Sequence, residues 1–245
     1  MVAVIIPARF ASTRFPGKPL HHIAGQPLIQ HVWERCRRCR HIGSIIIATD
    51  DDRIAAAARE FGAQVCLTSP DHQSGTDRIA EAARTLPDAT HIINVQGDEP
   101  LISPALVDEL AARMIADSSI GMITAVHALH DPALLDNPNI VKCVMSRDGR
   151  ALYFSRSRIP YPRSPAPGLT HWRHMGIYGF SRAFLEQFVA WEPSPLEMTE
   201  ALEQLRALEN GASIHVVVTD HDSPGIDTPE QAREVESLIA QRLAQ

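Results

Sequence analysis

The chain has 245 residues, of which 44% are hydrophobic and 21% are charged. Such a composition is ordinary for a folded domain and excludes a disordered chain. Its 23 basic and 29 acidic residues give a net charge of −6, so we expect no nucleic acid partner bound through phosphate contacts. No apolar run approaches the roughly 20 residues that span a bilayer, and we therefore expect no membrane insertion.

The start of the chain and its cysteines indicate a compartment. Residues 1–7 contain a short apolar stretch without a positively charged leader, which favours a first strand over a signal peptide. Four cysteines in a chain of this length do not form a disulfide framework. A reduced, cytoplasmic protein is therefore expected.

Short apolar segments alternate with amphipathic segments in the first half of the chain. This pattern predicts an α/β fold with a Rossmann-like, mostly parallel sheet and helices on both faces. Ligands of such sheets bind at the carboxyl ends of the strands, so the segments that follow strands are candidate sites. The expected strands cover residues 2–6, 45–48, 64–67, 91–95 and 121–126, and the expected helices 27–40, 52–61, 76–85 and 104–116.

The pattern changes after about residue 128. Extended runs follow one another without helices between them, and residues 146–149 are typical of a hairpin turn. This change predicts a small β-rich region after the parallel sheet. The extended runs cover residues 140–146, 150–155 and 176–180, followed by helices at 181–190, 197–209 and 228–244 and a strand at 214–218.

Residues 7–20, which follow the first expected strand, carry three cations, two hydroxyl groups and a glycine. A polyphosphate is bound by amide donors and fixed positive charge of this kind. The segment matches neither the Rossmann glycine pattern nor the Walker pattern. A phosphate-binding loop and a solvated basic loop are therefore equally supported by the spacing.

Carboxylates mark two other places along the chain. Asp98 and Glu99 follow the strand expected at 91–95, where they could hold Mg²⁺ together with substrate phosphates, although a simple turn is the alternative. Asp227 precedes the last expected helix. It is either an N-cap or a second metal ligand beside Asp98, and sequence spacing leaves both alternatives open.

Other polar groups have a structural interpretation. Residues 74–77 resemble an N-cap cluster, although the same free N–H groups could bind a nucleotide, and residues 50–52 are interpreted as capping acids. Cys36 and Cys39 lie on the apolar stripe of the helix expected at 27–40, which favours core packing over a metal site.

These segments together resemble the 3-deoxy-manno-octulosonate (Kdo) cytidylyltransferases, the CMP-Kdo synthetases of lipopolysaccharide biosynthesis. The matching stretches are IIPARFASTRFPGKPL, DHQSGTDRIAE, NVQGDEP, ALYFSRSRIP, HMGIYGF, PSPLEMTEALEQLR and GIDTPEQ, in this order along almost the whole chain. The resemblance implies the glycosyltransferase A-type fold of nucleotide-diphospho-sugar transferases. It also implies a single nucleotidyltransferase domain over 1–245, with a nucleotide-binding part at about 1–128 and a sugar-binding and dimerisation part at about 129–227.

The same resemblance implies a reaction in which CTP and Kdo give CMP-Kdo and pyrophosphate, with Mg²⁺ as cofactor. The anomeric hydroxyl of Kdo would attack the α-phosphorus of CTP. The family is homodimeric, and residues 140–180 are the expected contact region.

Site residues follow from the positions that match the family's motifs. The resemblance implies that Asp98 and Asp227 bind the metal and that Arg156 and His174 contact the Kdo carboxylate. The full implied set is Arg9, Lys18, Asp98 and Asp227 for catalysis; Ala8, Arg9, Ser12, Lys18, Gln73, Ser74, Gly75 and Asp98 for the nucleotide; and Gln96, Arg156, His174, Tyr178 and Glu203 for the sugar.

Two alternatives remain beside this interpretation. One is an enzyme of the same class that acts on an amino-substituted Kdo or another acidic sugar. The other is a catalytically inactive protein that senses a nucleotide, against which the presence of Lys18, Asp98 and Asp227 argues.

Overall fold

The computed structural model describes residues 1–11, 15–164 and 166–243, with side chains up to residue 239. The chain divides into two compact units, one of residues 1–112 with 223–245 and one of residues 113–222. The division expected at about residue 128 differs from this one in two ways. The strand at 122–129 lies in the second unit, and the last helix returns to the first unit.

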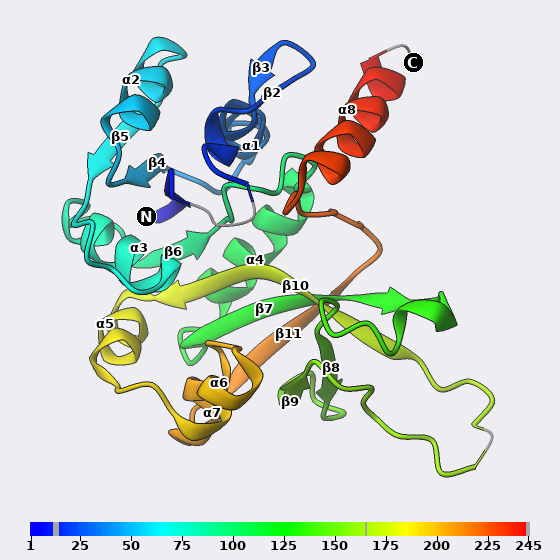
Figure 1. Ribbon diagram of the computed structural model, residues 1–245. Coiled ribbons are helices and arrows are strands. Elements are labelled where there is room, and N and C mark those ends of the chain that lie inside the picture. Colours follow the sequence, from blue (N-terminus) through cyan, green and yellow to red (C-terminus); the bar gives the residue numbers. More distant parts are fainter. Residues whose placement is uncertain (12–14, 165, 244–245) are drawn as a thin grey trace. The chain divides into compact units, whose positions relative to one another are not determined.

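A four-stranded parallel sheet with the order β6-β1-β4-β5 forms the centre of the first unit. All seven residues of β1 are buried, as the apolar run at the start of the chain predicts. In Figure 1, α1 and α2 lie above these strands and α3 lies below them. The strands are β1 (Val2–Ala8), β4 (Ser44–Thr49), β5 (Gln64–Leu67) and β6 (His91–Asn94), and the helices are α1 (Leu28–Cys36), α2 (Asp52–Glu60), α3 (Gly75–Arg84) and α4 (Pro104–Ala116). The predicted α/β class is confirmed.

Local signals in the sequence explain where these helices begin. Asp51 caps α2 by accepting a hydrogen bond from the backbone N–H of Arg53. Ser74 and Asp77 form a reciprocal capping box at the start of α3. Helix α1 buries its apolar stripe in the core. No side chain caps the start of this helix, and Pro27 stands directly before its first residue, in agreement with the preference of proline for helix starts.

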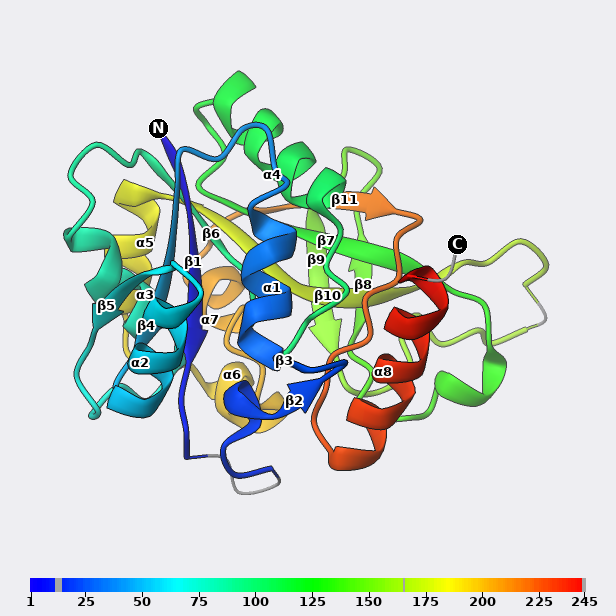
Figure 2. The ribbon, with the colours of Figure 1, turned by 90° about the horizontal axis from the view of Figure 1, so that it is seen from above.

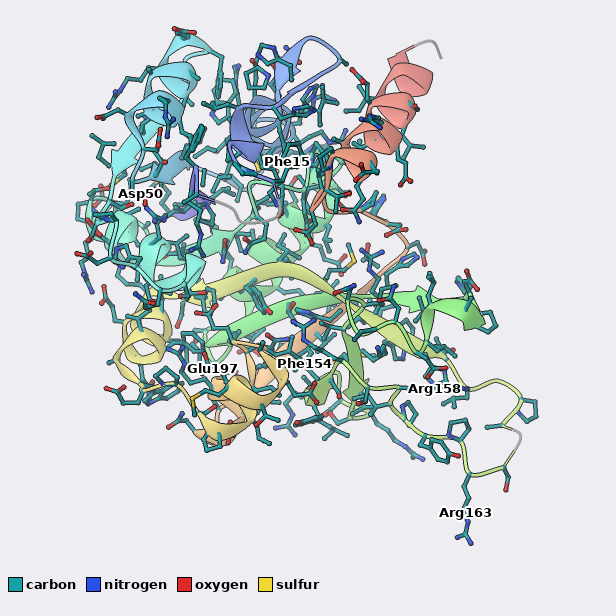
Figure 3. All side chains as sticks on the ribbon, in the orientation of Figure 1. Phe15, Asp50, Phe154, Arg158, Arg163 and Glu197 are labelled. Atoms are coloured by element: carbon teal, nitrogen blue, oxygen red, sulfur yellow. The ribbon has the colours of Figure 1, made fainter. Side chains whose placement is uncertain are left out.

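The C-terminal segment packs on the first unit through its own core cluster. Phe15, labelled in Figure 3, packs there with residues of the loop before α4 and of the last helix, α8 (Pro229–Leu243). Both ribbon views place α8 beside the small hairpin of β2 (His22–Ile23) and β3 (Gln26–Pro27), which the sequence did not predict (Figures 1 and 2). The cluster consists of Phe15, Ile23, Leu28, Leu101, Ile226, Ala232 and Val235.

The second unit is built on mixed strands. β7 (Met122–Leu129) pairs in parallel with β11 (Ile214–Thr219) and antiparallel with β10 (His171–Ser181). β8 (Lys142–Met145) and β9 (Ala151–Ser155) form the expected hairpin, with the predicted turn at Gly149 in the left-handed conformation (φ 79°). Strand β8 also pairs with the first part of β10.

Three short helices complete the second unit, and one prediction about them is wrong. The helix expected over 197–209 is two helices, α6 (Pro195–Glu200) and α7 (Leu205–Glu209), which follow α5 (Arg182–Ala190). The break occurs at Ala201, whose φ of 51° is left-handed. An ion pair between Glu197 and Arg206, 2.6 Å apart and largely buried, holds the two helices together.

Two 3₁₀ turns, η1 (Lys18–Leu20) and η2 (Pro132–Leu134), occur in connecting loops. Across the described part of the chain, no helix is both long enough and apolar enough to cross a membrane.

Candidate active site

The loop after β1 ends in a turn that fixes Lys18. Gly17 has a φ of 71°, which favours glycine, and it directly precedes the η1 turn. The backbone N–H of Gly17 donates to the Phe10 carbonyl at 3.0 Å and closes the loop. The Lys18 side chain is only 14% exposed, so its ammonium group has a defined position at the end of the strand.

Lys18 brings together the two carboxylates that lie far apart in the sequence. Its Nζ donates to Oδ2 of Asp98 at 2.5 Å and to Oδ1 of Asp227 at 3.4 Å. The backbone supports the same arrangement, because the N–H of Ile226 donates to the Asp98 carbonyl at 2.9 Å and Lys18 Nζ donates to the Ile226 carbonyl at 2.7 Å. Asp98 and Asp227 thus both contact a single cationic group.

The hydrogen bonds at the start of α8 show whether the Asp227 side chain caps this helix. The hydroxyl of Thr228 accepts from the backbone N–H of Gln231 at 3.4 Å, and the Gln231 side chain accepts from the N–H groups of Asp227 and Thr228. This reciprocal arrangement caps the helix. The carboxylate of Asp227 lies instead within reach of Lys18.

A cleft of about 470 Å³ opens around these groups, within the size range of small-molecule sites. Three cations and two carboxylates line it, and this combination fits a polyphosphate bound together with a divalent cation. Of the residues expected in the site, Ala8, Arg9, Lys18, Gly75, Gln96, Asp98 and Asp227 line this cleft.

The remaining residues expected to bind the nucleotide are absent from the lining of this cleft or fall outside the described residues. Ser74 is the N-cap of α3, and its hydroxyl is engaged with Asp77 at 2.9 Å. The Gln73 amide donates to the Asp71 carbonyl at 2.9 Å. Ser12 falls in residues 12–14, which the structure does not describe.

Gly97 serves close packing of two strand ends. A Cβ at this position would lie 2.8 Å from the Pro7 carbonyl, a distance that side chains do not tolerate. The glycine therefore lets the loop after β6 approach the end of β1, so that Gln96 and Asp98 reach the same cleft as Ala8.

Arg78 is a cleft residue that the sequence analysis missed. It is only 3% exposed, donates to the Thr68 hydroxyl and pairs with Asp50 at 3.2 Å. The interpretation of Asp50 as a capping acid is therefore wrong, whereas Asp51 is the cap of α2. The sequence signal was the position of Arg78 one turn into α3, on the same side as Ser74.

A stack of side chains supports the loop that carries Lys18. The guanidinium of Arg53 lies 3.3 Å from the ring centroid of Phe10 and also forms two hydrogen bonds with the Asp51 carboxylate. A Cβ built on Gly17 would be 3.0 Å from the Phe10 ring, so the ring packs closely against the residue before Lys18. The start of α2 is thus linked to Lys18 through Arg53, Phe10 and Gly17.

Four of the five residues expected to bind the sugar lie in the second unit, and Gln96 lies in the cleft of the first. Arg156 follows β9, and its guanidinium donates to the carbonyls of Pro138, Glu200 and Ala201 at 2.9, 2.6 and 3.1 Å. A guanidinium has five N–H groups, so these contacts leave two further donors.

Two residues that the sequence analysis missed hold Arg156. Lys142 is fully buried, and its ammonium donates to the carbonyls of Asn137, Ile140 and Arg156. Burial lowers the pKa of Lys142. The Glu200 carboxylate accepts from the Arg156 backbone N–H at 2.9 Å and from the Ser155 hydroxyl at 2.6 Å. The signal in the sequence was Lys142 itself, a lysine next to the apolar residues Cys143, Val144 and Met145 of an expected strand.

His174 and Tyr178 belong to an aromatic cluster around β10. The His174 ring centroid is 4.9 Å from that of Phe154, labelled in Figure 3, and 5.3 Å from that of Tyr178. Burial, together with the charge of Arg173, lowers the pKa of His174 to about 3. Burial and the nearby Glu203 carboxylate raise the pKa of Tyr178 well above its ordinary value. Both side chains are therefore neutral near pH 7.

Cys36 and Cys39 have the properties of packing residues. Burial raises the pKa of Cys36 far above its ordinary value and that of Cys39 to about 12, so both thiols stay protonated. Among the described residues, no group of three or more metal-ligating side chains comes together.

Comparisons with known proteins identify the family of this chain. The family described as cytidylyltransferase matches residues 3–214. A 3-deoxy-manno-octulosonate cytidylyltransferase of Geobacter sulfurreducens is 49% identical, covering 96% of this chain and 97% of that protein. A protein of the same name from Marinobacter nauticus is 47% identical, covering 96% of both chains.

Solved structures give the same result. A CMP:2-keto-3-deoxy-manno-octonic acid synthetase in complex with CTP is 40% identical and superposes with a TM-score of 0.94 over 98% of this chain and 99% of that chain. A cytidylyltransferase of Leptospira borgpetersenii, 20% identical with a TM-score of 0.67 over 98% of this chain and 87% of that chain, shows the same fold. The chain therefore belongs to the 3-deoxy-manno-octulosonate cytidylyltransferases, a family of nucleotidyltransferases.

Proposed function

We propose that this chain transfers a cytidylyl group from CTP to Kdo, giving CMP-Kdo and pyrophosphate for lipopolysaccharide biosynthesis. The observation that carries the proposal is the convergence of Asp98 and Asp227 on Lys18 inside a cleft of about 470 Å³. The names of the relatives, at 47–49% identity, support the same substrates.

The reaction requires positioning and neutralisation of charge. The anomeric hydroxyl oxygen of Kdo forms a bond to the α-phosphorus, and the bond from that phosphorus to the bridging oxygen of the β-phosphate breaks. Pyrophosphate leaves with the bonding electrons, and the hydroxyl proton passes to solvent. Lys18 and Arg9 stabilise the negative charge that grows on the phosphates during this step.

Asp98 and Asp227 fit a Mg²⁺ site. Both carboxylates lie within 3.4 Å of one ammonium nitrogen, and both residues line the same cleft. Two carboxylates completed by substrate phosphates form a typical Mg²⁺ ligand set. Bound there, the ion would polarise the α-phosphate and lower the pKa of the attacking hydroxyl. Lys18 would remain beside the carboxylates as a further positive charge on the leaving group.

The start of α3 supports cytidine binding. Gly75 and Ala8 line the cleft and offer backbone groups to the base and ribose. Gln73 and Ser74 lie next to Gly75 in the chain, and we assign them, with Ser12, to the nucleotide site. The buried Arg78, paired with Asp50, adds a cation to the lining of the same cleft.

The acidic sugar is assigned to Gln96, Arg156, His174, Tyr178 and Glu203. Arg156 suits the carboxylate, because a guanidinium binds carboxylates with paired donors. Its three contacts with backbone carbonyls hold it in one orientation. Neutral Tyr178 and the Glu203 carboxylate suit sugar hydroxyls, as does Gln96.

One assay tests this function. The protein is incubated with CTP, Mg²⁺ and Kdo, and CMP-Kdo and pyrophosphate are detected at early times. Parallel reactions contain an amino-substituted Kdo and N-acetylneuraminate. We expect Mg²⁺-dependent pyrophosphate release that is fastest with Kdo. Faster pyrophosphate release with another acidic sugar would identify that sugar as the acceptor in place of Kdo. No release with any sugar would favour a nucleotide sensor.

We further propose that the enzyme is a homodimer. Large apolar side chains are exposed in the expected contact region, among them Leu152 and Tyr161 at 61% and 80% exposure. Light scattering of the purified protein should give twice the mass of the chain, and Leu152→Lys should shift it toward the monomer. A monomeric mass for the unaltered protein at micromolar concentration would contradict the assignment.

A cytoplasmic location is proposed on the basis of the free thiols. Cys36, Cys39, Cys66 and Cys143 are all unpaired by disulfides, which agrees with a reducing compartment. Fractionation of cells that express the tagged protein tests this assignment.

A further inference from the structure

Thr124 is a buried polar residue in the middle of β7, next to an irregularity in β10. The register between the two strands shifts between Met175 and Tyr178, so Ile177 has no register partner on β7. Thr124 is fully buried, and its hydroxyl oxygen lies 2.7 Å from the Ile177 carbonyl, 3.0 Å from Nε2 of His174 and 3.4 Å from the more distant Met175 carbonyl. Buried polar atoms of this kind require hydrogen-bond partners.

The number of protons decides how these contacts are arranged. A threonine hydroxyl has one hydrogen to donate, and the carbonyl can only accept. The carbonyl at 2.7 Å takes this hydrogen, because otherwise two oxygen lone pairs would face each other at that distance. Nε2 of His174 must then carry a hydrogen and donate it to the Thr124 oxygen, because an unprotonated Nε2 would also face a lone pair at 3.0 Å.

This arrangement fixes the tautomer of His174. The imidazole is neutral near pH 7, because burial and the charge of Arg173 lower its pKa to about 3. A neutral imidazole with a hydrogen on Nε2 has a bare lone pair on Nδ1. The residue therefore offers an acceptor on its other nitrogen, and it carries no positive charge.

We propose that Thr124 is a positioning residue that holds His174 as the Nε2–H tautomer, so that Nδ1 accepts a hydrogen bond from a hydroxyl of the acidic sugar. The inference rests on the proposed function and sharpens it. It replaces the expectation that His174 contacts the sugar carboxylate, because a bare nitrogen lone pair and a carboxylate repel each other. The carboxylate is left to Arg156, whose guanidinium has donors beyond its three carbonyl contacts.

A spectroscopic experiment tests the tautomer without any enzyme assay. The protein is labelled with ¹⁵N-histidine, and His174 is assigned by comparison with His174→Gln. At pH 7 we expect a protonated Nε2 and an unprotonated Nδ1. In Thr124→Val, which removes the hydroxyl at nearly constant shape, we expect a mixture of tautomers, whereas Thr124→Ser should keep the original one. A protonated Nδ1 in the unaltered protein would overturn the proposal.

Kinetics then tests the role of the acceptor. Thr124→Val should raise the KM for Kdo roughly 10-fold, the effect of about one hydrogen bond, and leave the KM for CTP unchanged. Thr124→Ser should restore most of the affinity, which a role in shape alone would not explain. Equal loss in the Val and Ser variants, or a rise in the KM for CTP, would contradict a positioning role.

Sugar analogues identify the group that His174 contacts. The inhibition constants of monodeoxy Kdo analogues and of Kdo amide, which lacks the charged carboxylate, are compared in the unaltered protein and in Thr124→Val. The monodeoxy analogue that lacks the hydroxyl contacted by His174 should inhibit both proteins equally. Kdo amide, which keeps that hydroxyl, should inhibit Thr124→Val more weakly than the unaltered protein. If the inhibition constant of Kdo amide does not change in Thr124→Val, His174 contacts the carboxylate and the proposal is wrong. If the protein binds no acidic sugar, the proposed function fails, while the tautomer measurement still stands by itself.

Discussion

The cleft of the first unit contains ion pairs, whereas the polar groups in the aromatic cluster of the second unit are neutral. In the cleft, Lys18 forms ion pairs with Asp98 and Asp227, and the three side chains are 14%, 29% and 45% exposed. In the cluster, burial holds His174 and Tyr178 in their neutral forms. Ion pairs near water can break and re-form with a charged substrate. Neutral buried groups instead bind substrate hydroxyls through hydrogen bonds of fixed direction.

The largest expected effect concerns Asp98, the carboxylate that we propose binds Mg²⁺ in the cleft. Asp98→Asn should lower the rate of pyrophosphate release on the order of 10³-fold, because an amide is a poor Mg²⁺ ligand and the charge at the ion is halved. Asp52→Asn, an exposed carboxylate in the first turn of α2, is the matched control and should be active. A rate within a few-fold of normal for Asp98→Asn, at saturating Mg²⁺, would remove this residue from the metal site.

Lys18 should act mainly on the chemical step. Lys18→Ala should lower kcat on the order of 10²-fold, the effect of losing one donor to the transition state. The KM for CTP should change far less, because Arg9 and the loop backbone, which we propose also contact the phosphates, are unchanged. Steady-state kinetics separates the two, with the exposed Arg38→Ala as control. A change confined to the affinity for CTP would show that Lys18 binds the ground state only.

The neutral cluster can be tested through the dependence of stability on pH. The pKa of His174 is lowered to about 3 in the folded state, against about 6.5 when unfolded, so its neutral form is favoured by folding. Stability is therefore lost as the pH falls below 6.5, and the loss between pH 7 and pH 5 should be about 2 kcal/mol. Urea unfolding at both pH values measures it, and His174→Gln should show a correspondingly smaller loss. Identical pH dependence in both proteins would indicate an imidazole open to water.

The stack of Arg53 on Phe10 should influence the cleft from outside. Arg53→Met should raise the KM for CTP roughly 5-fold, because a cation–π contact of this strength no longer holds the loop before Lys18. Arg53→Lys should be intermediate. Combining Arg53→Met with Phe10→Leu gives a double-mutant cycle, and strictly additive effects would show that the contact does not support the loop.

The smallest effect is expected for the buried thiol. Cys36→Ala should lower the free energy of unfolding by about 1 kcal/mol, the cost of a small cavity in the core under α1. Activity should be unchanged. Metal analysis of both proteins provides the check, since loss of a bound metal on this substitution would contradict a packing role.

Much of the first unit could be predicted from the sequence because its elements bury regular apolar patterns. The strands at β1, β4, β5 and β6 occur within a few residues of their expected positions. The division of residues 197–209 was not predictable in this way, because Ala201 adopts a left-handed conformation without the glycine that usually marks it. The pairing of β2 with β3 was also missed, since each has only two residues.

The site was predictable where a residue type has few other uses. Two adjacent acidic residues at a strand end, and a lysine after a glycine, drew attention to the site, although a simple turn and a solvated loop were the alternatives. Asp50 and Arg78 do not, because a capping position and a helical surface position explain each of them in isolation. Only the tertiary fold places Arg78 against Thr68 and Asp50, and the same holds for Lys142 beneath Arg156.

The packing of α8 on the first unit has a consequence for protein synthesis. Asp227 adjoins Ile226, which packs in the cluster around Phe15, and this segment is synthesised after every strand of the parallel sheet. A nascent chain can thus complete the parallel sheet before it contains the second carboxylate beside Lys18. If Asp227 serves the proposed metal site, a chain that stops upstream of this residue is expected to be inactive.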